Sequence, residues 1–206
     1  MSYVPIFHLT VPAVWISVLL AAVAASLLTR VAARRKLGEW YWNALALYIV
    51  IWKLSYIVFH LPHFLDMPLS ILYFNGGLYG HLLAIASLLG YLALAQRKHA
   101  AVAEQAATAW LLFFLAYQSI LHYFEAQLMQ AALHNSLFLA AIVAIRTLGK
   151  RPDVPNGLLL SAFFTVELLI LSIFGPLVTW QNATLLAVAA FTIGIYIRFE
   201  QKGPSI

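Results

Sequence analysis

The sequence contains no cysteine and has few charged residues. Only 9% of its 206 residues are Asp, Glu, Lys or Arg, whereas 64% are hydrophobic. The absence of cysteine excludes disulfide bonds, thiol redox chemistry and cysteine lipidation. The scarcity of charge is untypical of a soluble domain and indicates a polytopic membrane protein. The net charge of +5 is spread over short segments, which is typical of loops beside an anionic leaflet and not of a nucleic-acid-binding surface.

Seven apolar stretches are long enough to cross a bilayer as α-helices, which takes about 20 residues each. We therefore expect an all-α polytopic membrane protein whose seven transmembrane helices form a single domain over residues 1–206. Glu125 is the only charged residue between Ala107 and Ile145, so one kinked element is an alternative to two helices there. The expected spans are Val11–Val31, Trp40–His60, Leu78–Ala95, Ala107–Phe124, Leu128–Ile145, Gly157–Phe174 and Val178–Ile197.

Basic residues are absent from every second connection between these spans. Cytoplasmic loops carry an excess of Lys and Arg, so the pattern predicts an N-terminus outside and a C-terminus in the cytoplasm. A site that faces outwards across a single bilayer suits the bacterial plasma membrane, where we expect this multi-pass protein to reside. Of the twelve basic residues, all except Lys53 lie on the expected cytoplasmic side: Arg30, Arg34, Arg35, Lys36, Arg97, Lys98, Arg146, Lys150, Arg151, Arg198 and Lys202.

The connection Leu61–Gly77 is too apolar for a solvated loop and too interrupted to span the membrane. It contains Pro62, Pro68 and the turn sequence Asn75-Gly76-Gly77. Irregular backbone at membrane depth must be covered by protein. We therefore expect an interfacial or re-entrant segment here.

Polar residues gather towards the expected outer side of the membrane. Of the seven histidines, only His99 is expected on the cytoplasmic side; the others are His8, His60, His63, His81, His122 and His134. At a rise of about 1.5 Å per residue, six polar residues lie at similar depth in the outer half: Lys53, His81, Ser119, His122, His134 and Glu167. Together they predict a polar cavity that opens outwards, and separate hydrogen bonds between helices are the alternative.

Lys53 and Glu167 each place a charge inside an apolar span, which costs about 3 kcal/mol or more for a residue alone. Because they lie at comparable depth on two different helices, we expect them to form an ion pair. This pair would either hold the two helices in register or present Lys53 to an anionic lipid headgroup.

A metal site is an alternative use of the outer histidines. His60, His63 and Asp66 are spaced at i, i+3 and i+6, and imidazole and carboxylate groups are suitable ligands for zinc. Pro62 interrupts the helix between the two histidines, which weakens the pattern. The first expectation is therefore a protein without a metal or another cofactor, and the metal site is kept as the alternative.

The stretch from Lys53 to His81 resembles the prolipoprotein diacylglyceryl transferase family. In both, a proline-containing outer segment is followed by a Gly-Gly turn, here Asn75-Gly76-Gly77, and then by a histidine at the start of the next helix, here His81. Arg151–Leu158 is similar to the family's Arg-Pro to Gly-Leu stretch before its sixth helix. The resemblance implies the transfer of diacylglyceryl from phosphatidylglycerol to a lipoprotein cysteine.

The resemblance also implies roles for individual residues. His81 would be the catalytic acid or base, Lys53 would bind phosphate, and the turn at Asn75, Gly76 and Gly77 would supply backbone donors. Ser119, His122 and Glu167 would complete the phospholipid site. The expected partners are a phospholipid and a lipoprotein or another membrane protein, with no nucleic acid.

The chain departs from that family at the residues that would hold the phosphate. Tyr117–Phe124 contains no arginine where the family has one, and Glu167 stands near a second essential arginine. The periplasmic head domain is reduced to a turn near Glu125, and Ile16 takes the place of a tyrosine. These departures motivate a second hypothesis, a non-catalytic membrane protein of the same fold that binds a lipid or a partner.

Overall fold

The computed structural model describes residues 3–6, 9–34, 36–72, 74–149, 156–176 and 178–202. His8, Tyr73 and the basic residues Arg35, Lys150 and Arg151 therefore lie outside the described residues. The chain divides into two compact units. Gly38–Val102 is called the hairpin unit, and Met1–Leu37 with Ala103–Ile206 is called the bundle unit. The single domain expected from the sequence stays a prediction.

Within the described part of the chain, seven helices are long and apolar enough to cross a membrane, which confirms the predicted number. The turn between the fourth and fifth of them contains Ala126 in a left-handed conformation, with φ of 58°. Two helices therefore form where one kinked element was the alternative. The seven are α1 (Ala13–Ala32), α2 (Glu39–Phe59), α4 (Gly77–Lys98), α5 (Ala100–Phe124), α6 (Leu128–Thr147), α7 (Asn156–Phe174) and α8 (Trp180–Lys202).

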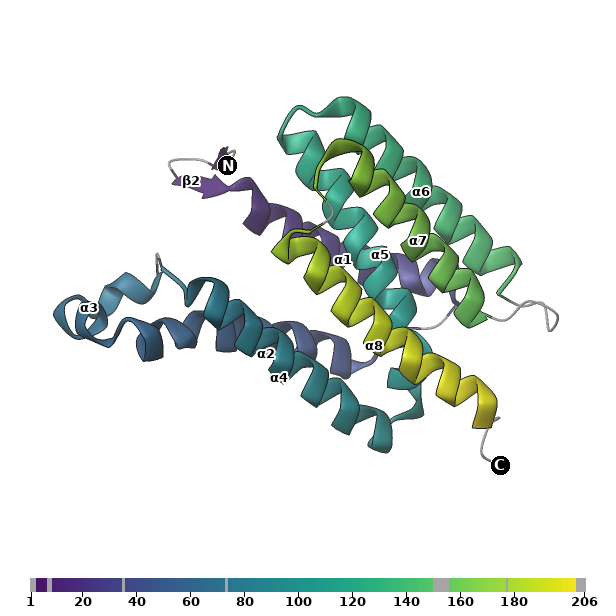
Figure 1. The fold of residues 1–206 in the computed structure, drawn as a ribbon, viewed down its shortest axis with the longest axis horizontal. Coiled ribbons are helices and arrows are strands. Elements are labelled where there is room, and N and C mark those ends of the chain that lie inside the picture. Colours follow the sequence, from purple (N-terminus) through teal and green to yellow (C-terminus); the bar gives the residue numbers. More distant parts are fainter. Residues whose placement is uncertain are drawn as a thin grey trace. The chain divides into compact units, whose positions relative to one another are not determined.

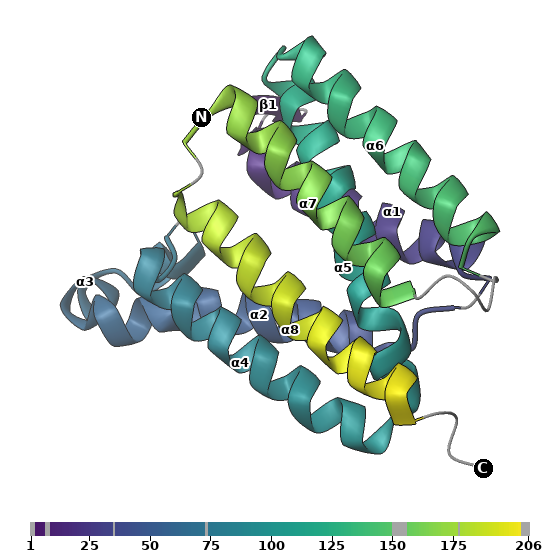
Figure 2. The same cartoon turned by 45° about the vertical axis from the view of Figure 1, so that its right-hand side comes forward.

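In the hairpin unit, α2 and α4 lie side by side and are joined by two short helices (Figures 1 and 2). These are α3 (Leu61–Asp66) and the 3-10 helix η1 (Pro68–Leu72). Pro62 lies in the first turn of α3, where its missing N–H would have no intrahelical partner anyway. The connection between the two long helices is thus helical, but neither short helix is long enough to span the membrane. This agrees with the expectation that Pro62 and Pro68 interrupt the segment.

Small residues allow α2 and α4 to approach closely. Ser55 of α2 is buried, and its side chain occupies the space where a Cβ atom at Gly76 or Gly80 would lie. The N–H of Gly76 donates to the carbonyl oxygen of Trp52 at 3.0 Å. Close backbone contact through small residues is a common way to pack membrane helices, because lipid gives no hydrophobic force between them.

The bundle unit contains α1, α6, α7, α8 and nearly all of α5. Figure 2 shows α6 and α7 next to each other. Helix α5 is the most buried of the seven spans, and Leu111, Leu112 and Leu115 on it are fully buried. It starts at Ala100, seven residues before the expected Ala107, because alanine favours helix even where Glu104 and Gln105 lower the hydropathy.

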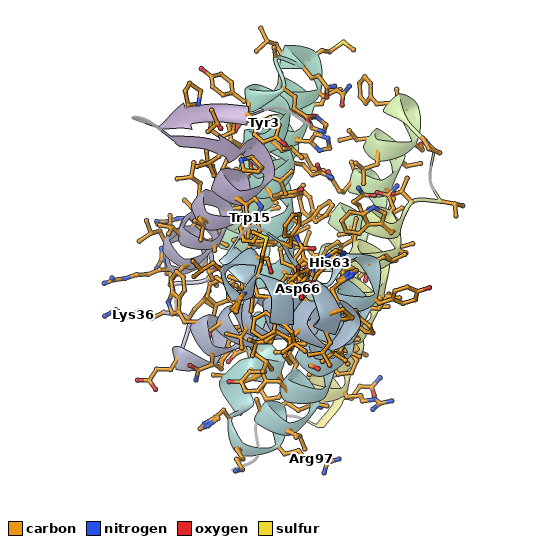
Figure 3. All side chains as sticks on the ribbon, turned by 90° about the vertical axis from the view of Figure 1, so that its left-hand side faces the viewer. Tyr3, Trp15, Lys36, His63, Asp66 and Arg97 are labelled. Carbon is orange, nitrogen blue, oxygen red and sulfur yellow. The ribbon has the colours of Figure 1, made fainter. Side chains whose placement is uncertain are left out.

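A short antiparallel hairpin precedes α1, and it was not expected from the sequence. Strand β1 (Tyr3–Ile6) pairs with β2 (Leu9–Pro12), and Figure 3 labels Tyr3 on it. Val11 and Pro12 therefore pair with Val4 and Tyr3 instead of starting the helix. The seven candidate membrane spans are all α-helices, so the expected all-α class holds for them despite this hairpin.

The last helix also starts later than expected, at Trp180 instead of Val178. The side-chain oxygen of Thr179 accepts a hydrogen bond from the N–H of Asn182 at 3.1 Å. This is the N-cap arrangement, in which a threonine hydroxyl satisfies a free N–H group of the first turn. Hydropathy includes Val178 in the span, but the cap decides where the helix begins.

The orientation predicted from basic residues can be tested by labelling, because the chain has no cysteine of its own. Leu65 on α3 and Lys98 at the end of α4 are both exposed. We expect a membrane-impermeant maleimide to label Leu65→Cys in intact cells and to label Lys98→Cys only after permeabilisation. Labelling of Lys98→Cys in intact cells would show that the orientation is wrong.

Candidate functional site

The polar residues singled out in the sequence fall into two clusters, one in each unit. The His81 cluster of the hairpin unit consists of Tyr48, Lys53 and His81 with the turn at residues 75–77. The Glu167 cluster of the bundle unit consists of His122, Gln127, His134 and Glu167. The six residues expected to line one outer cavity are thus divided between the two units, and that shared cavity stays a prediction.

His81 lies one turn into α4, where it is buried and contacts Tyr48 of α2. The hydroxyl oxygen of Tyr48 lies 2.7 Å from His81 Nδ1, and the two rings meet edge to face with centroids 5.8 Å apart. If the Tyr48 hydroxyl donates, His81 Nδ1 accepts the hydrogen bond and Nε2 of the neutral ring carries the proton. If His81 Nδ1 donates instead, Nε2 is the basic atom of the ring. The hydrogen bond therefore fixes the ring and allows it to act either as an acid or as a base.

Lys53 is half-buried on α2 and contacts the end of η1. Its Nζ donates to the carbonyl oxygens of Ile71 at 3.2 Å and Phe74 at 3.1 Å. These bonds hold the connecting segment against α2. Carbonyl oxygens have no net charge, so they orient the ammonium group without neutralising it.

The turn Asn75-Gly76-Gly77 fixes the start of α4. Asn75 Oδ1 accepts from the N–H of Gly77 at 2.9 Å, and Trp52 Nε1 donates to the carbonyl oxygen of Gly77 at 3.3 Å. Gly77 has φ of 59°, a conformation that glycine adopts without strain. The N–H groups of Gly76 and Gly77 are thus both bonded within the protein, and their expected role as phosphate donors stays a prediction.

The Glu167 cluster joins α6 to α7 inside the bundle unit. His134 Nδ1 lies 3.0 Å from Glu167 Oε2, and the two side chains are 1% and 0% exposed. Among the described residues, the second carboxylate oxygen, Oε1, has no hydrogen-bond partner. The ring of His122 stacks on that of His134 at 5.2 Å and 12°, and His122 Nδ1 lies 2.7 Å from Gln127 Oε1.

Within the bundle unit, the carboxylate of Glu167 pairs with His134, and within the hairpin unit Lys53 donates to the carbonyls of the connecting segment. The ion pair expected between Lys53 and Glu167 would join the two units and stays a prediction. A carboxylate that is 0% exposed and carries the same sign as phosphate is poorly placed to bind a lipid headgroup. Ser119, also expected at the lipid site, is half-buried on α5 one turn before His122.

The alternative metal site is not formed. His60, His63 and Asp66 are exposed on or beside α3, and Figure 3 labels the last two. Among the described residues, no three His, Cys, Asp or Glu side chains are grouped so that they could hold a metal ion. The ring of His60 instead lies 5.2 Å from that of Tyr56.

Sequence reasoning missed Tyr48 and Gln127, the residues that position His81 and His122. Tyr48 lies five residues before Lys53 in the same span, and a hydroxyl in an apolar stretch is a signal that could have identified it. Gln127 lies in a turn and carries no comparable signal. His134 and Glu167 had been placed at similar depth, but depth alone does not show which side chains face each other.

Comparisons of the chain with protein-family models, curated proteins and solved structures found no match. The resemblance to diacylglyceryl transferases therefore receives no support from them. The composition and length of the helices establish a multi-pass membrane protein with seven candidate spans.

The contact between Ser55 and Gly80 gives a test of the α2–α4 packing. We expect Gly80→Ala to lower the free energy of unfolding by about 1–3 kcal/mol, because the added methyl group meets the Ser55 side chain. Gly90→Ala is the matched control on the same helix, since a Cβ atom there meets nothing within 4 Å. Unfolding of purified protein in mixed micelles, followed by circular dichroism, measures both. Equal effects of the two substitutions would contradict the packing.

Proposed function

We propose that this protein binds an anionic phospholipid beside Lys53 and transfers its diacylglyceryl group to a membrane-bound acceptor, with His81 as the general acid or base. The observation that carries the proposal is the partly buried hydrogen bond between Tyr48 and His81. Lys53 lies on the same helix as Tyr48, about 7.5 Å further along its axis. A cation and an oriented imidazole are thus held by one pair of packed helices.

Lys53 supports the lipid-binding part of the proposal. An ammonium group in an apolar span attracts an anion, and the anion available at this depth is the phosphate of a lipid. The bonds to Ile71 and Phe74 keep the amine at the end of η1. Under the orientation predicted from the basic residues, this end faces outwards at the surface of a bacterial plasma membrane.

His81 supports the transfer part. In the reaction implied by the family resemblance, the thiol of a lipoprotein cysteine gives its proton to the imidazole ring. The sulfur then bonds to the glyceryl carbon, and the bond from that carbon to the phosphate oxygen breaks, with its electrons left on the departing glycerophosphate. Histidine suits this step because its charge changes near neutral pH.

A second candidate is a non-catalytic protein that binds a phospholipid or a membrane partner. It is favoured by the backbone N–H groups of Gly76 and Gly77, which are bonded within the protein. It is also favoured by the burial of Glu167 and by the lack of arginine in α5, since little besides Lys53 is left to clamp a phosphate. This candidate predicts bound lipid without turnover.

Lipid retention tests the role of Lys53. We expect native mass spectrometry of detergent-extracted protein to show a retained anionic phospholipid. In Lys53→Met the retained fraction should fall about tenfold, which corresponds to a loss of about 1.4 kcal/mol of binding energy. Lys98→Met, which removes a charge at the other end of the hairpin unit, is the control and should keep its lipid. Equal retention by Lys53→Met and the unmodified protein would refute the phosphate-binding role.

Turnover tests the role of His81. With phosphatidylglycerol and a cysteine-containing lipoprotein peptide in vesicles, we expect transfer by the unmodified protein. His81→Gln should reduce the rate by about 10²–10⁴, as expected when a general acid or base is lost. Tyr48→Phe should reduce it less and alter its pH profile, because the ring loses its orienting bond. His63→Gln changes an exposed histidine outside the cluster and should retain full activity.

Two outcomes would overturn the transferase proposal. Full activity in a folded His81→Gln variant would exclude His81 as the acid or base. Retained lipid together with no transfer by the unmodified protein would favour the non-catalytic candidate.

A further inference from the structure

We propose that His134 and Glu167 form an intramembrane proton-binding site, which exchanges protons with solvent at the α5–α6 turn through His122. The site lies wholly in the bundle unit, and the inference does not depend on the lipid proposal. The ligand of the site is the proton itself.

The first observation is the burial of two ionisable side chains that contact each other. Glu167 and His134 come from different helices and meet at 3.0 Å with almost no exposed surface. Ionisable residues inside membrane spans are costly and are a default sign of function. A proton held at this contact lies between two basic groups, so it belongs to the pair and not to either residue alone.

The second observation is the oxygen Oε1 of Glu167, which has no hydrogen-bond partner in the part of the chain that the structure describes. A buried acceptor without a partner is costly, and a purely structural hydrogen bond to His134 would be served by a neutral side chain. A metal ion is not supported, because no suitable group of three ligands occurs among the described residues. A proton, in contrast, needs only the basic atoms that the pair already provides.

The third observation is the position of His122. Gln127 Oε1 can only accept a hydrogen bond, so His122 Nδ1 is the donor at 2.7 Å and its Nε2 is left as an acceptor. The same ring is stacked on His134 and is half-buried near the end of α5. Gln127 and Ala126 in the adjoining turn are exposed. His122 therefore connects the buried pair with a solvent-facing turn.

Other titratable groups lie in the second half of α5 and in the turn that follows it. They are Tyr117, His122, Tyr123 and Glu125. On α1, Arg30 at the far end is the only charged residue, and α8 has Tyr196, Arg198, Glu200 and Lys202 near its far end. Arg146 lies at the far end of α6. The carboxylate facing His134 is thus that of Glu167, and a change at Glu167 tests the pair directly.

The experiment is ¹⁵N NMR of histidine-labelled, full-length protein in lipid nanodiscs, with the His134 signals assigned by their loss in His134→Asn. We expect both ring nitrogens of His134 to report the gain of a proton when the pH is lowered over the range in which the protein stays folded. In Glu167→Gln the hydrogen bond is retained but the compensating charge is lost, so the buried ring should stay neutral over that range.

The route is tested by the rate at which the His134 signals respond to a pH jump. His122→Phe keeps an aromatic ring against His134 but cannot carry a proton. We expect it to slow the response about tenfold, which corresponds to about 1.4 kcal/mol of added barrier. His63→Phe, in the hairpin unit, is the control and should respond as fast as the unmodified protein.

Circular dichroism and gel filtration establish that each variant is folded before it is compared. Unchanged His134 signals in the unmodified protein would overturn the proposal, as would the same pH response in Glu167→Gln. An undiminished rate in His122→Phe would overturn the route through that residue.

Discussion

A polar group in a membrane helix must find its partner within the protein, because hydrocarbon offers none. Several serine and threonine side chains in this chain meet that requirement within their own helix. Thr29 donates to the carbonyl of Ala25, Thr192 to that of Val188, and Ser161 to that of Gly157. Such residues place no demand on the packing of one helix against another.

The ionisable residues have no such local solution, and they reach across to a second element. Lys53 reaches the connecting segment, His81 reaches Tyr48, and Glu167 reaches His134. In the hairpin unit these bonds act together with the Ser55–glycine contacts to set how α2 lies against α4. In the bundle unit the buried pair fixes one point of contact between α6 and α7. The residues that are most costly to place in a membrane are therefore the ones that specify which elements pack together.

This division also explains what could be predicted from the sequence. The length and hydropathy of a span are local, additive properties, so each of the seven helices begins or ends within two residues of an expected bound. The helix ends that differ from the expected bounds depend on interactions that a hydropathy average does not measure. Examples are the Thr179 cap and the pairing of Val11 with Val4. The partner of Glu167 could not be predicted, because residue counting gives depth along a helix but not the direction in which a side chain points. His134 lies at a comparable depth, and helix packing within the bundle unit brings it to Glu167.

The two clusters differ in the chemistry they can support. The stretch that resembles diacylglyceryl transferases, from Lys53 to His81, lies entirely in the hairpin unit, where a cation and an oriented imidazole suit an anionic lipid. The departures from that family, at Tyr117–Phe124 and Glu167, lie in the bundle unit. A carboxylate bonded to an imidazole repels phosphate and holds protons, whereas an arginine in its place would do the opposite. Under the two proposals, the bundle unit therefore holds an acid–base centre where the family would have a phosphate clamp, and lipid binding is left to the hairpin unit.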